Sequence, residues 1–100
     1  MSRQRELQKT FEELLGTRNV YFQPPESMKL NYPCIIYSRN IIRNLNANNK
    51  PYKIDEGFSV MYIDKDPDSE IPLKLSSLPK CSFDRHYTAD NLNHDVFTIF

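Results

Sequence analysis

Residues Glu56–Asp64 (EGFSVMYID) predict a β-strand whose two faces are both apolar. Alternate positions divide its side chains between the faces, with Phe58, Val60 and Tyr62 on one and Met61 and Ile63 on the other. Such a strand needs cover on both sides, from a helix and from neighbouring strands. We therefore expect this segment to lie in the centre of a small sheet.

The other periodic segments predict two helices and four further strands. Leu7, Phe11 and Leu14 fall on one face of a helix that Ser2 begins and Gly16 ends. The expected elements are a helix over 2–15, strands over 19–23 and 34–37, a short helix over 68–78, and strands over 81–87 and 94–100. This order predicts an α+β fold, a mainly antiparallel sheet flanked by helices, in a single domain spanning 1–100.

A long segment at 38–55 lacks a clear period and is expected to form a loop. Five asparagines between 40 and 49 indicate turns, and four basic residues precede the first acid, Asp55. Ile41, Ile42 and Leu45 interrupt its polarity. A basic, Asn-rich loop of this length is either solvated or an arm that docks on a neighbour.

Composition excludes several classes of function. The 13 basic and 13 acidic residues give a formal net charge of zero, which argues against a protein that coats DNA or anionic membranes. No apolar run approaches the ~20 residues of a membrane span. The charged start lacks the pattern of a secretory signal, so we expect a cytoplasmic protein. Cys34 and Cys81 are expected to be free thiols, and no cofactor or metal is expected.

The segment Cys81–Phe100 is rich in groups that could carry chemistry. A small hydrolase or nuclease using His86 and His94 is one interpretation. The residues show no nucleophile setting and no metal-ligand spacing, so turn chemistry explains the acids and asparagines better. A third interpretation is a nucleic-acid-binding module. It would use the basic residues Arg39, Arg43, Lys50 and Lys53.

The same segment finishes on apolar residues, which predicts contact with a partner. Together with the 38–55 segment it supplies the candidate interface. Its members are Arg39, Ile41, Ile42, Arg43, Leu45, Lys50, Lys53, Val96, Phe97, Ile99 and Phe100.

Four stretches resemble a small head–tail joining (neck) protein of long-tailed phages and prophages of Gram-positive bacteria. They are YPCIIY at 32–37, NNKPYK at 48–53, YIDKDPDSEIP at 62–72 and LPKCSFDRHYTADNLNHDVFTIF at 78–100. Among neck proteins the element order is similar to the tail terminator (tail completion) group. Head-closure proteins, the near alternative, are similar to small β-barrels that lack the second helix.

The resemblance implies a structural virion protein without catalytic residues, assembled in the host cytoplasm. Its copies would form a ring, typically hexameric, that caps the tail tube and docks to the head connector. The implied partners are other copies, the tail tube protein and head-closure or connector proteins. DNA would at most pass through the lumen. The 38–55 segment would reach a neighbouring subunit or that lumen.

Overall fold

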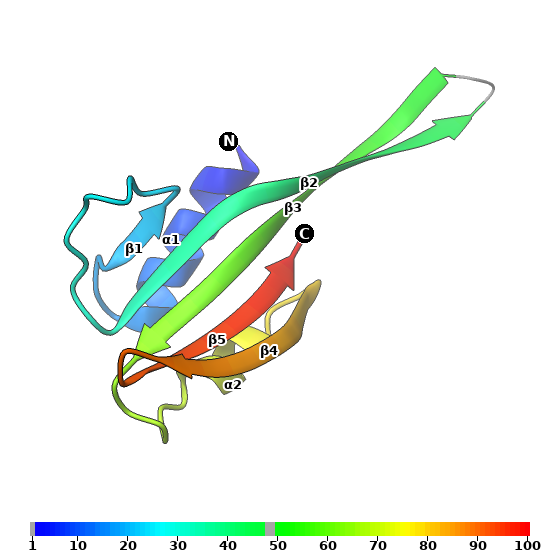
Figure 1. The fold of residues 1–100 in the computed structure, drawn as a ribbon. Coiled ribbons are helices and arrows are strands. Elements are labelled where there is room, and N and C mark those ends of the chain that lie inside the picture. Colours follow the sequence, from blue (N-terminus) through cyan, green and yellow to red (C-terminus); the bar gives the residue numbers. More distant parts are fainter. Residues whose placement is uncertain (1, 48–49) are drawn as a thin grey trace.

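The computed structural model describes the backbone of residues 2–47 and 50–100, and the side chains of residues 2–40 and 56–100. It is an α+β fold with the expected order of elements (Figure 1). The helices and strands are α1 (Arg3–Leu15), β1 (Val20–Phe22), β2 (Cys34–Ala47), β3 (Lys50–Asp64), α2 (Ile71–Ser76), β4 (Cys81–Ala89) and β5 (Leu92–Ile99).

The strands form one five-stranded sheet in the order β1-β2-β3-β5-β4. β1 runs parallel to β2, and the other three pairings are antiparallel. β3 is central, as its two apolar faces predicted. β1 and β4 form the two edges of the sheet.

Helix α1 begins and ends at the residues that the sequence indicated. The Ser2 hydroxyl accepts a hydrogen bond from the Arg5 N–H at 3.2 Å. At the other end, Gly16 has a φ of 81° and donates its N–H to the Glu12 carbonyl at 2.9 Å. Glycine suits this left-handed conformation because a residue with a Cβ atom would be strained in it.

Replacing Gly16 with alanine should lower the free energy of unfolding by about 1 kcal/mol. The cost is conformational, because no atom lies within 4 Å of a Cβ built at this position. Gly16→Asn is the matched control and should cost less, since asparagine tolerates a positive φ better than alanine. Urea unfolding of both variants tests the ranking, and equal losses would contradict it.

Both helices cover the same face of the sheet (Figure 1). Leu7 and Phe11 from α1 and Leu75 from α2 pack against the alternate residues of the strands that point toward them. These strand residues are Val20, Ile35, Tyr37, Phe58, Val60, Tyr62, Phe97 and Ile99. The core is therefore drawn from both helices and from every strand except β4, whose partly buried Cys81 packs against it.

A hydrogen-bond network adds a polar anchor between α1 and the sheet. The buried Tyr37 hydroxyl accepts from the Gln4 amide at 2.8 Å and lies 2.6 Å from the Gln8 side-chain oxygen, to which it donates. Burial raises the pKa of Tyr37, and its bond from Gln4 partly offsets the rise. These contacts fix the position of α1 across β2.

The prediction of a loop at 38–55 is wrong for the described residues of this segment. Residues 38–47 continue β2 and residues 50–55 begin β3, so the segment is a two-stranded ribbon. Antiparallel pairing with β3 satisfies the backbone of the asparagine-rich residues, and this outweighs their preference for turns.

Candidate functional site

The two-stranded ribbon extends away from the rest of the molecule (Figure 1). We call it the arm and define it as residues 38–47 of β2 with residues 50–57 of β3. It accounts for the elongated shape of the molecule, whose principal extents are 51 × 25 × 24 Å. β1 pairs with β2 only from Ile35 to Tyr37, and β5 pairs with β3 only from Phe58 onward. Both outer edges of the arm are thus without a strand partner in the described sheet.

One basic residue of the arm forms an ion pair with an acid, and a second lies opposite an acid in the strand pairing. Arg39 forms an ion pair with Glu56 at 3.4 Å, and Arg43 lies opposite Asp55 in the strand pairing. Lys50 opposes Ala47, and Lys53 opposes Leu45. The arm therefore carries less uncompensated charge than its four basic residues suggested.

The structure brings the candidate residues of the 38–55 segment together on the arm. The side chains of Ile41, Ile42, Arg43, Leu45, Lys50 and Lys53 lie outside the described residues. Their backbone places them in the two paired strands, and Arg39 is exposed at the base of the arm.

Strand β4 is another open edge, and the sequence alone did not indicate it as a surface. Eight of its nine residues are exposed, including Phe83 at 52% and Tyr87 at 36%. A bulge between Phe83 and Arg85 interrupts its pairing with β5. On the face opposite the helices, the Tyr87 ring stacks on His94 with centroids 4.6 Å apart, and Arg85 lies 5.6 Å from the centre of the Tyr87 ring.

Phe97 and Ile99 do not belong to an exposed interface, which corrects that expectation. Both lie on the helix-covered face and are buried within the chain. Val96 lies on the opposite face and is also buried, at 7% exposure. The chain itself supplies the cover that these apolar residues require, so they stabilise the fold. Phe100 is half-buried, and its N–H donates to the Lys80 carbonyl at 3.2 Å.

The two histidines lie on opposite faces of the sheet. His86 opposes Asp95 in the register, and Tyr87 opposes His94 one residue further along. His86 Nδ1 lies 2.7 Å from an Asp95 carboxylate oxygen on the helix side. His94 Nδ1 instead lies 3.1 Å from the Leu92 carbonyl. Because adjacent strand residues point to opposite faces, the histidines do not form one catalytic pair.

A tyrosine-centred network at the start of the 64–70 turn was missed by the sequence analysis. The Tyr62 hydroxyl lies 2.5 Å from an Asp64 carboxylate oxygen and 2.9 Å from the Ser69 hydroxyl. Burial and the bond to Asp64 raise the pKa of Tyr62. The Ser69 oxygen also accepts from the Ile71 N–H at 3.3 Å. The network ties β3 to the start of α2, which is a structural role.

Both thiols are free, as expected. Burial raises the pKa of the Cys34 thiol and of the Cys81 thiol to about 11, so both stay protonated at neutral pH. Because thiolates are the nucleophilic form, neither cysteine is an activated nucleophile.

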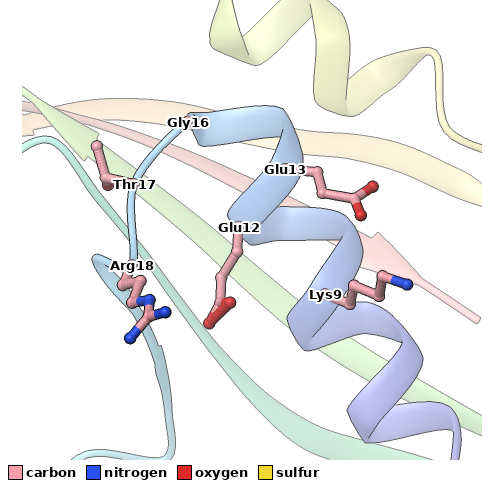
Figure 2. A pocket seen from close by; sticks show the side chains of 6 residues that line it. All are labelled: Lys9, Glu12, Glu13, Gly16, Thr17 and Arg18. Atoms are coloured by element: carbon pink, nitrogen blue, oxygen red, sulfur yellow. The ribbon is translucent and has the colours of Figure 1, made fainter.

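A shallow hollow lies beside the end of α1 (Figure 2). Charges of both signs surround it, and its lining residues are Lys9, Glu12, Glu13, Gly16, Thr17 and Arg18. The Glu12 carboxylate already accepts from the Gln8 amide at 2.9 Å. With two acids balanced by two bases, the hollow favours neither an anion nor a cation.

The described residues also bear on metal and membrane binding. Among the residues whose side chains are described, 2–40 and 56–100, no three His, Cys, Asp or Glu side chains gather as a metal site. Neither of the helices in this part of the chain is long and apolar enough to cross a bilayer.

Comparison with known sequences does not assign the chain to a family. No protein-family model matches this chain. No significant similarity to a curated protein was found either. The structure itself presents two open surfaces, the arm and the edge of β4.

Proposed function

We propose that this chain is a structural subunit of a phage head–tail junction, of the tail terminator type. Its copies assemble into a ring that caps the tail tube and docks to the head connector. The observation that carries the proposal is the arm, a ribbon that extends from the folded body with both outer edges unpaired in the described sheet.

The stability of such a ribbon argues for a partner. An isolated two-stranded hairpin is marginally stable in water. The arm also carries Ile41, Ile42 and Leu45 in its sequence, and a protein surface that buries apolar residues would stabilise it. An arm of this kind suits a subunit that assembles with its neighbours.

The rest of the fold favours the terminator over the head-closure alternative. The sheet is open, with β1 and β4 at its edges, and helix α2 lies between β3 and β4 in the chain. The resemblance leads us to expect these features in a terminator, whereas head-closure proteins are similar to closed barrels without the second helix. The positions of His86 and His94 remove the support for a shared catalytic site.

Self-association is the first test of this function. We expect the purified protein to form a closed oligomer whose population rises with concentration, measured by mass photometry and light scattering. Negative-stain microscopy should show rings. Phage particles made without the protein should accumulate as separate heads and tails, and adding it should restore joining. A strict monomer, together with normal joining in its absence, would refute the proposal.

A further inference from the structure

We propose that the arm of one copy adds its β2 edge to strand β4 of the next copy. The open β2 side of the arm and the open edge of β4 are then the two halves of one interface. This inference rests on the proposed ring and specifies the contact that builds it.

The two edges lie on opposite sides of the same sheet. β1 pairs with β2 only at Ile35–Tyr37, and the Arg39 N–H donates to the Gln23 side chain at 3.3 Å, so the outer side of β2 is open along the arm beyond Arg39. β4 is the last strand on the other side. Exposed strand edges present unpaired N–H and C=O groups that accept another strand. Pairing of two unlike edges is heterologous, so each copy binds two neighbours and the series can close into a ring.

Strand direction makes this pairing antiparallel. β2 is antiparallel to β3, β3 to β5, and β5 to β4, so β4 runs opposite to β2. Rotation about a ring axis to which the strands are inclined, by about 35–45° as in closed barrels, keeps the neighbouring edge strands close to antiparallel. The β4 of one copy therefore meets the β2 of the next in the more stable, antiparallel sense.

The register also requires a displacement between copies. One row of paired residues crosses the sheet at the base of the arm: Arg39, Phe58, Ile99 and Cys81. From this row the arm extends to one side, whereas β4 extends to the other. A neighbour that uses the arm must therefore shift along the strands. Because the strands are inclined to the ring axis, rotation alone supplies this shift, as it does for the staggered strands of closed barrels.

The backbone groups that face outward follow from the pairing. The Gln23 N–H donates to the Tyr37 carbonyl at 2.9 Å, so the backbone N–H and C=O of Tyr37 point toward the β1 side of β2. Antiparallel pairs alternate between bonded and non-bonded positions. With one extra residue, Asn40, at the bulge, this alternation assigns the outward N–H groups of the arm to Ile42 and Asn44.

The same reasoning assigns the outward groups of β4. Asp90 and Asn91 have φ values of 53° and 63°, and they link Ala89 to its partner Leu92. In such two-residue hairpins the flanking pair is hydrogen-bonded. The next pair, Thr88 with Asn93, is then non-bonded, so the Thr88 N–H points away from β5.

Charge and apolar surface favour a second copy as the occupant of β4. Residues 38–47 contain Arg39 and Arg43 but no acid, whereas 81–91 contain Asp84 and Asp90 against Arg85. Two arms pairing with each other would oppose like charges. β4 also exposes Phe83 and Tyr87, which offer apolar contact to the arm. DNA offers no comparable apolar surface, and Arg39 already pairs with Glu56.

Replacing Thr88 with proline removes the outward N–H and tests the β4 half. Self-association should weaken at least about tenfold, since the added strand loses a hydrogen bond and its path is obstructed. The melting temperature should change little, because this N–H takes no part in the β4–β5 ladder. Thr88→Ala is the matched control and should assemble like the wild type.

Asn44→Pro tests the arm half, with Asn44→Ala as its control. Each proline variant should be monomeric alone. An equimolar mixture should form a 1:1 dimer and stop there, because one copy retains the arm and the other retains β4. Light scattering of the separate and mixed variants measures this, and circular dichroism verifies that each is folded.

Several results would overturn the inference. A Thr88→Pro protein that assembles like the wild type would do so, as would a mixture of folded variants that remains monomeric. Dimers of Asn44→Pro would indicate pairing of β4 with β4. Steeply salt-dependent DNA binding lost in Asn44→Pro, with self-association intact, would make DNA the occupant of the arm. A wild-type protein that stays monomeric would also refute the proposed function. A ring that still forms in both proline variants would refute only the pairing of the arm with β4.

Discussion

Replacing Phe97 with alanine is expected to lower the free energy of unfolding by about 3–5 kcal/mol. Phe97 is 0% exposed, opposes Val60 on the central strand and lies in the cluster beneath the helices. Truncation removes the ring from the core and leaves a cavity that close-packed neighbours fill only in part. Natural domains have stabilities of about 5–15 kcal/mol, so the variant should be near the limit of folding.

Phe83→Ala is the matched control for this substitution. Phe83 faces Phe97 across the β4–β5 pair, with ring centroids 5.5 Å apart, but it is 52% exposed. Its truncation should cost about 1 kcal/mol or less. Urea unfolding of both variants measures the difference. If Phe97→Ala kept its stability but lost self-association, the original interpretation of this residue as an interface residue would be restored.

Alkaline pH should destabilise the fold through Cys34. Burial raises the pKa of this thiol from the ordinary 9.0 to about 11, so the folded state holds the proton more tightly than the unfolded chain. The resulting stabilisation is complete below pH 9 and is lost as the pH rises from about 9 to about 11. Because Cys34 is 0% exposed, the loss should reach roughly 2 kcal/mol.

Comparison with Cys34→Ala isolates this contribution. Tyr37, Tyr62 and Cys81 also have raised pKa values, but their effects are common to both proteins. The alanine variant should start less stable at pH 8 and lose about 2 kcal/mol less than the wild type by pH 11. Urea titrations under reducing conditions across this range give the two curves. Parallel curves would show that Cys34 does not drive the change.

The elements with a clear period were predictable from sequence because local and long-range preferences agree there. The apolar stripe of α1, its Ser2 cap and its Gly16 end specify one helix, and the structure confirms it at Arg3–Leu15. Alternation likewise identified the central strand and the closing hairpin. The observed hairpin turn at Asp90 and Asn91 lies between the strands expected at 81–87 and 94–100.

The arm was not predictable by the same reasoning. Its residues combine turn-forming asparagines with scattered apolar side chains, and local preference favoured a loop. What makes it a ribbon is backbone pairing with β3, which continues past the bulge at Asn40 as far as Ala47 and Lys50 and which residue-by-residue preferences do not reveal. The role of Phe97 and Ile99 was misjudged for a related reason. Strand periodicity shows which residues share a face but not which face the helices cover.

The core joins the first and last elements of the chain, and this has a consequence for the time course of folding. Leu7 and Phe11 come early in the sequence, whereas Phe97 and Ile99 of the same buried cluster come about 90 residues later. During synthesis, α1 and the β2–β3 hairpin emerge before the strand that completes their apolar surface. Folding must therefore await β5, and until then the nascent chain exposes surface that chaperones recognise.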